Sequence, residues 1–121
     1  MSSGDIFHFS NAQENIFLLQ LGEITGDPNA PFVVIGFDVD EQATLGCHNK
    51  LPAYLIKKST AGTFPYQDAL IPVRDPRLLL VATVEKLPVV KTLSPVQMEH
   101  LKKCAEKHKQ MPLLYFKYFV V

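Results

Sequence analysis

The stretch Leu93-Ser94-Pro95-Val96-Gln97-Met98-Glu99-His100-Leu101 carries the local signals of a helix N-terminus. Ser94 is a favourable N-cap, because its hydroxyl can accept a hydrogen bond from the backbone N–H of Gln97. The side chain of Gln97 can reach back to Ser94 and complete a capping box. Pro95 falls at the first helical position, where a missing N–H costs nothing. The sequence therefore predicts a helix that starts at Ser94.

The residues that follow this start are amphipathic. Apolar residues recur at three- and four-residue steps and give one face suited to burial: Met98, Leu101, Cys104 and Ala105. Leu93, before the cap, is spaced to pack on Met98 as a hydrophobic staple. The other face is charged, and its lysines gather toward the C-terminal end, where they complement the helix dipole. We expect one helix over residues 94–109 that packs against the rest of the chain.

Most of the chain before this helix has the patterns of short strands and turns. In the first strand, Ile6 and His8 fall on one face, whereas Phe7 and Phe9 fall on the other. Together these patterns favour a mainly β fold with one α-helix in the C-terminal half, built as a small barrel or a strongly bent antiparallel sheet packed by the helix, in a single domain 1–121. The predicted strands are Asp5–Ser10, Ile16–Leu21, Phe32–Val39, Ala53–Lys57, Ala69–Val73, Leu78–Leu87 and Leu113–Val121.

The composition excludes several classes of protein. The chain has 121 residues, 47% of them hydrophobic, which is enough for one core. Twelve basic residues balance twelve acidic ones, so no global field draws the chain to DNA or to an anionic membrane. Apolar runs such as Leu78–Ala82 are far shorter than the roughly 18 residues of a membrane span, and residues 1–5 lack the basic start of a signal peptide. We expect a cytoplasmic protein with no membrane or DNA partner.

The acidic residues and the cysteines give weak signals for chemistry. Asp38, Asp40 and Glu41 could converge on a divalent metal, but the glycine and the terminal glutamate of a calcium loop are missing, and a solvated strand end is the better interpretation. The two cysteines predict neither a disulfide framework nor a Cys-x-x-Cys metal pair, and Cys104 is expected as a small core residue. Cys47 adjoins His48, but neighbouring side chains in a strand point to opposite faces, which argues against a thiol–imidazole dyad.

The histidines are scattered along the chain. His100 and His108 lie two helical turns apart, which separates them too far to share a metal, and these two and His8 are expected at the surface or at its boundary. We therefore predict no metal and no cofactor.

Basic and aromatic residues gather around one loop. Lys57, Lys58, Arg74 and Arg77 flank the loop Ser59–Tyr66. The aromatic rings of this loop belong to Phe64 and Tyr66. Such a mixture suits single-stranded RNA through phosphate contacts and base stacking. The alternative is that Phe64 and Tyr66 are core and rim residues.

Four features follow one another within residues 4–108: the opening Gly4-Asp5-Ile6-Phe7, the strand Pro31–Ile35, the loop Ser59–Tyr66, and the run Val81–Leu87 that leads into Leu93–Met98 and its helix. In this order they show a resemblance to the PemK/MazF/Kid group of toxin–antitoxin proteins. It implies an SH3-like barrel with a C-terminal helix, a homodimer, an antitoxin-like protein partner, and cleavage of RNA without a metal. A homodimer is also favoured by Leu113–Val121, whose aromatic and aliphatic residues suit an edge strand that pairs with another copy.

The resemblance also implies catalytic residues. The family's catalytic threonine or serine would fall on Thr60 or Ser59. Family members place an arginine immediately before the proline of the Val-Val strand, and here that position is Ala30. The cation that stabilises the phosphate would then come from Lys58, Arg74 or Arg77. Two functions follow: a toxin-type, metal-independent endoribonuclease that acts on single-stranded RNA, or a noncatalytic barrel that binds a protein or RNA partner.

Overall fold

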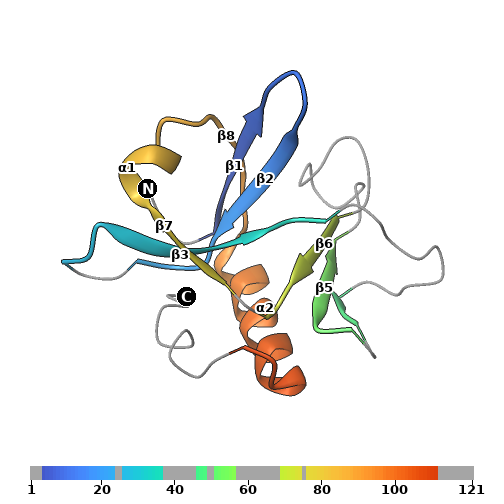
Figure 1. Ribbon diagram of the computed structural model, residues 1–121. Coiled ribbons are helices and arrows are strands. Elements are labelled where there is room, and N and C mark those ends of the chain that lie inside the picture. The colour runs from blue at the N-terminus through green and yellow to red at the C-terminus, as the bar shows by residue number, and fades with distance from the viewer. Residues whose placement is uncertain are drawn as a thin grey trace.

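The computed structural model describes residues 4–23, 26–36, 46–48, 51–56, 69–74 and 76–111. Short strands make up more of this part of the chain than helices do, and one long helix follows them, which confirms the predicted mainly β fold (Figure 1). The strands are β1 (Asp5–Ser10), β2 (Asn15–Gln20), β3 (Asn29–Val34), β4 (Gly46–Cys47), β5 (Ala53–Ile56), β6 (Ala69–Pro72), β7 (Arg77–Leu80) and β8 (Val89–Thr92), and the helices are α1 (Val81–Val84) and α2 (Pro95–His108).

The strands form two antiparallel sheets. The larger sheet has the order β7-β3-β2-β1-β8, and the smaller one has the order β4-β5-β6. A β-bridge between Gly36 and Leu70 joins them, with N···O distances of 2.9 and 2.7 Å. The described strands therefore form two bridged sheets, and they do not close into one barrel.

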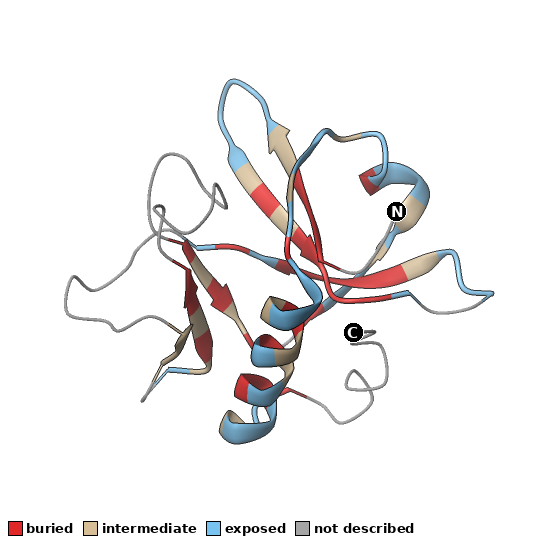
Figure 2. Ribbon diagram, turned by 180° about the vertical axis from the view of Figure 1, so that it is seen from behind, coloured by how far each residue is buried: buried red, intermediate tan, exposed pale blue. Residues whose placement is uncertain are grey.

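Helix α2 lies across both sheets and completes the main core. Its buried residues are the predicted stripe of Met98, Leu101, Cys104 and Ala105. They pack with residues of both sheets, among them Ile6, Leu19 and Ile71. Figure 2 shows the buried residues on the strands and on the helix face directed toward them. Burial of this apolar stripe fixes the helix on the sheets, because apolar burial is the main favourable term in folding.

A second, smaller core lies on the opposite face of the larger sheet. Successive side chains of a strand alternate between faces, so Ile6 belongs to the main core whereas Phe7 packs with Ala30, Phe32 and Val84. The rings of Phe7 and Phe32 meet edge to face, with their centroids 6.2 Å apart. The predicted alternation of the first strand is confirmed.

The entry to α2 confirms the predicted capping box. The backbone N–H of Gln97 donates to Ser94 Oγ at 3.1 Å, and the backbone N–H of Ser94 donates to Gln97 Oε1 at 3.0 Å. Leu93 and Met98 are both buried, as a hydrophobic staple requires. The helix ends at His108, and Lys109 follows in the left-handed conformation with φ 55°.

Gly4 connects the start of α2 to the larger sheet. Its N–H donates to the carbonyl of Gln20 at 2.8 Å, and its own carbonyl accepts from the N–H of Leu93 at 2.9 Å. Its φ is +91°, and a Cβ atom at this position would lie 2.9 Å from the Leu93 carbonyl oxygen. Only glycine fits here without a shift of the backbone.

The predicted strand Leu78–Leu87 is wrong in its second half. Strand β7 ends at Leu80, which pairs with Asn29, the first residue of β3. Pro28 precedes Asn29 and has no N–H to extend the ladder. Its carbonyl instead accepts from the N–H of Val81, the first residue of α1, at 2.9 Å.

Three further differences concern single elements. Strands β4 and β8 were not among the predicted strands, and β3 starts at Asn29 rather than Phe32. The predicted strand Leu113–Val121 lies outside the described residues. No helix in the described ranges has the length and apolar character needed to cross a membrane.

Candidate functional site

Most of the predicted RNA-binding loop lies outside the part of the chain that the structure describes. This holds for Lys57, Lys58, Ser59, Thr60, Phe64 and Tyr66, and also for the acidic residues Asp38, Asp40 and Glu41. Arg74 and Arg77 are described, and both are exposed. A basic rim that joins them to the loop stays a prediction.

Ala30, where the resemblance would place an arginine, lies inside the fold. It pairs with Leu79 of β7, and only 1% of its surface is exposed. It also lines a pocket of about 370 Å³, together with Glu23, Asp27 and Glu85. The acidic residues of this pocket disfavour a phosphate at Ala30, because like charges repel.

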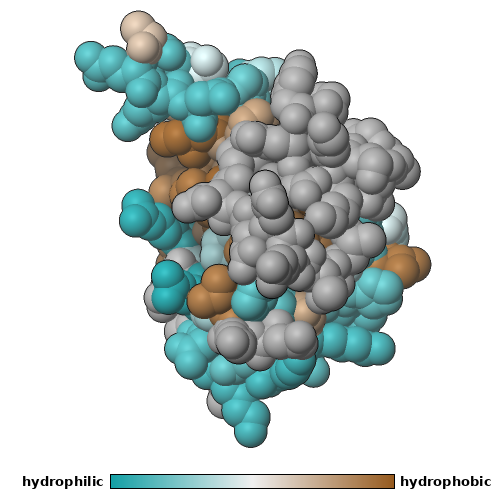
Figure 3. Space-filling model, turned by 90° about the vertical axis from the view of Figure 1, so that its right-hand side faces the viewer, coloured by the Kyte–Doolittle hydropathy of each residue, from teal (hydrophilic) through white to brown (hydrophobic). Residues whose placement is uncertain are grey.

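A second pocket, the apolar groove, runs over the outer face of the larger sheet beside α1. Its volume is about 490 Å³. Val34 and Leu80 in its wall are 45% and 46% exposed. Figure 3 views the molecule from the side and shows exposed hydrophobic surface below the hydrophilic tip of the β1–β2 hairpin. The residues that line the groove are Phe9, Ile16, Leu18, Val34, Arg77, Leu79, Leu80, Thr83, Val84 and Leu87.

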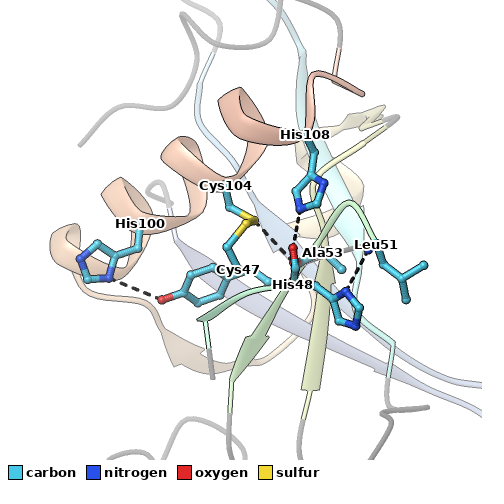
Figure 4. The surroundings of a disulfide bond; sticks show 8 residues. Cys47, His48, Leu51, Ala53, His100, Cys104 and His108 are labelled. Carbon is cyan, nitrogen blue, oxygen red and sulfur yellow. Dashed lines mark hydrogen bonds between the residues drawn. A yellow bond between two sulfur atoms is a disulfide. The ribbon is translucent and has the colours of Figure 1, made fainter. Parts of the chain in front are cut away.

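Cysteine and histidine side chains gather where α2 meets the smaller sheet (Figure 4). Cys47 of β4 and Cys104 of α2 form a disulfide, with their Cα atoms 5.4 Å apart. Cys104 is buried, as predicted, but the prediction that the two cysteines form no disulfide framework is wrong. The two residues are 57 positions apart, and only the packing of α2 on β4 and β5 brings them together.

Histidines surround this disulfide. His108 Nε2 lies 2.7 Å from the carbonyl oxygen of His48, which accepts a hydrogen bond from it. His48 Nδ1 accepts from the N–H of Leu51 at 2.8 Å. The side chain of His48 is therefore held in the turn before β5, and the dyad of Cys47 with His48 is not formed.

The two sulfur atoms and a ring nitrogen of His108 form a cluster of three potential metal ligands. One ligand atom from each of Cys47, Cys104 and His108 lies within 4.8 Å of the others. His100 does not belong to this group. The cluster was not predicted from the sequence, because its one local signal is the spacing of Cys104 and His108, four residues apart on one helix face.

A shallow pocket of about 300 Å³ opens beside the cluster. It is lined by the two cysteines, Gly46, Tyr54, His100, Lys103 and Lys107. The hydroxyl of Tyr54 lies 3.5 Å from His100 Nδ1. Burial raises the pKa of Tyr54 above its ordinary value, because desolvation disfavours the phenolate. The pocket therefore has a neutral tyrosine and two lysines around the sulfur atoms at pH 7.

Comparisons with protein-family models, with curated proteins and with solved structures found no match to this chain. The resemblance to the PemK/MazF/Kid group, the homodimer and the ribonuclease activity stay predictions. The fold and the sites described above carry the functional inference.

Proposed function

We propose that this chain is a noncatalytic protein-binding module that holds an apolar segment of a partner protein in the apolar groove. The observation that carries the proposal is the groove itself, which has a volume of about 490 Å³ and a largely aliphatic lining. Pockets that bind ligands commonly have volumes of roughly 300–1,000 Å³ and apolar linings. Exposed apolar surface rimmed by polar residues is typical of interaction sites.

Arg77 defines the kind of segment that fits. It is the one charged side chain among the described residues that line the groove. It stands opposite Phe32 in the β3–β7 ladder and is itself exposed. Arginine pairs with carboxylates through two parallel hydrogen bonds and is enriched at protein interfaces. The partner segment therefore has apolar side chains and at least one aspartate or glutamate.

The noncatalytic character is supported by the surroundings of Ala30. An arginine is absent there, and no cation replaces it among the described residues that line the neighbouring pocket. Those residues include Glu23, Asp27 and Glu85, which oppose the approach of a phosphate. Cleavage of RNA through Thr60 or Ser59 is the competing hypothesis.

A peptide-display experiment tests the groove. Random 12-residue peptides are selected on the immobilised full-length protein, and the affinity of the selected peptides is measured by fluorescence anisotropy. We expect peptides with two or more large apolar residues and an acidic residue. Arg77→Glu should weaken their binding by at least about tenfold, because like charges then meet at the interface. A second selection on Arg77→Glu should favour lysine or arginine in place of the acid.

Arg74→Glu is the matched control. Arg74 is exposed and lies outside the groove, so the same change of charge should leave the selected peptides bound. Equal loss for both variants would reduce the effect to net charge and contradict the proposal. Cleavage of a long single-stranded RNA by the purified protein in EDTA, lost in Thr60→Ala, would establish the nuclease instead.

A further inference from the structure

Two structural elements supply the three potential ligands of the Cys47–Cys104–His108 cluster. Cys104 and His108 are four residues apart on α2 and share one face of it, and Cys47 comes from β4, on which α2 packs. In the structure the sulfur atoms are bonded to each other. Once they are reduced, the same residues offer two thiolates and an imidazole, a donor set that favours zinc over magnesium or calcium.

The spacing of the residues allows zinc coordination with little movement. Two zinc–sulfur bonds of about 2.3 Å at a tetrahedral angle place the sulfur atoms about 3.8 Å apart. This separation lies inside the 4.8 Å that already encloses all three ligand atoms. The Cα atoms of the cysteines, 5.4 Å apart, need no large shift of α2 from the smaller sheet.

A hydrogen bond already orients the imidazole of His108. A carbonyl oxygen can only accept, so the 2.7 Å contact with the His48 carbonyl places the proton on Nε2. In the neutral ring, Nδ1 then keeps its lone pair, and zinc can bind Nδ1 or can bind Nε2 in place of this hydrogen bond. Zinc-binding histidines usually donate their second N–H to a carboxylate or a backbone carbonyl in this way.

The neighbouring pocket leaves a coordination position open. Within the described residues, the cluster has three potential protein ligands, and no further histidine, cysteine or acidic residue belongs to it as a fourth. These three ligands would face the pocket of about 300 Å³. Two thiolates neutralise the charge of Zn²⁺, and the nearby Lys103 and Lys107 therefore do not oppose the complex. Water or a small anion can occupy the fourth position, as in open zinc sites.

We propose that reduction of the Cys47–Cys104 disulfide creates a zinc site formed by Cys47, Cys104 and His108. A dithiol reductant supplies two electrons and two protons, the S–S bond breaks into two thiols, and the reductant becomes a disulfide. Zinc then displaces both thiol protons. The predicted cytoplasmic location is a reducing environment, in which the thiol form predominates. Bound zinc would then replace the disulfide as the cross-link between β4 and α2.

Cobalt(II) is the probe for this site, because it replaces zinc and absorbs visible light. The full-length protein is reduced with dithiothreitol, freed of it without oxygen, and titrated with Co²⁺. We expect one equivalent to bind, with a thiolate-to-cobalt charge-transfer band that disappears when Zn²⁺ is added. The oxidised protein should give no such band. The comparison of oxidised with reduced wild-type protein requires no variant to fold.

Variants then assign the ligands. Cys47→Ser and His108→Ala should each weaken cobalt binding by about tenfold or more, and Cys47→Ser should also diminish the charge-transfer band. His100→Ala is the control, because His100 lies on the same helix and next to the same pocket but outside the cluster. The proposal is overturned if reduced wild-type protein gives no band, or if the band is unchanged in Cys47→Ser. Neither outcome bears on the apolar groove.

Discussion

Gly4 shows how one residue can fix the relation between a sheet and a helix. Its backbone holds the end of β2 through Gln20 and the entry to α2 through Leu93. The positive φ and the close Leu93 carbonyl oxygen leave no room for a side chain. The entry to α2 is thus joined to the end of β2 through two hydrogen bonds of one glycine.

Substitution of Gly4 by alanine should destabilise the protein by about 1–3 kcal/mol, because a positive φ and a contact with backbone are both imposed on the new Cβ. Urea unfolding followed by circular dichroism measures the loss. Gly26→Ala is the control, since Gly26 has a similar φ of +79° but a Cβ atom added there would meet nothing within 4 Å. Equal losses for the two variants would show that the contact with Leu93 is unimportant.

At the scale of elements, α2 could be predicted closely and β7 could not. The cap, the proline and the apolar stripe of α2 are local signals, and they agree with one another. The run from Leu78 to Leu87 has strand propensity throughout. Its pairing partner β3, however, begins only at Asn29, directly after a proline, so the ladder stops at the Asn29–Leu80 pair. Where strand length is set by a distant neighbour, propensity alone does not locate the end.

Two substitutions in α2 separate its cap from its packing. Leu101→Ala should cost about 2–5 kcal/mol, because Leu101 is 1% exposed and its loss leaves a cavity in the main core. Ser94→Ala should cost about 1 kcal/mol through the lost capping box. Both are measured as free energies of unfolding in urea. Val96→Ala is the control, since Val96 is 63% exposed and a surface change should have little effect.

The candidate sites were harder to predict than the elements. The position of Arg77 in the wall of the apolar groove was not predicted, and its expected place at the rim of an RNA-binding loop stays a prediction. The cluster of Cys47, Cys104 and His108 depends on a contact between residues 57 positions apart. No local pattern encodes such a contact, because it arises only when α2 packs on the smaller sheet.

For the whole molecule, we expect the Cys47–Cys104 bond to contribute strongly to stability. It joins residues 57 positions apart, and loop-closure entropy predicts about 4 kcal/mol for a loop of this size. Guanidinium unfolding with and without dithiothreitol, in EDTA so that metal plays no part, measures the difference. Cys47→Ser/Cys104→Ser should match the reduced wild-type protein. Equal midpoints in both redox states would mean that the bond adds no stability.

The order of strands in the larger sheet has a consequence for how the protein is made. The three strands nearest the N-terminus, β1 to β3, occupy the centre, and the edges are closed by β7 and β8. Asp5 of β1 pairs with Thr92 of β8. This edge of β1 therefore stays unpaired until the ribosome has added 58 residues beyond the end of β3 at Val34. At typical rates of synthesis this takes about 3–12 s. Until β7 and then β8 have been made, the central strands carry unpaired edges, and the nascent chain has to be kept from aggregating before its own later strands arrive.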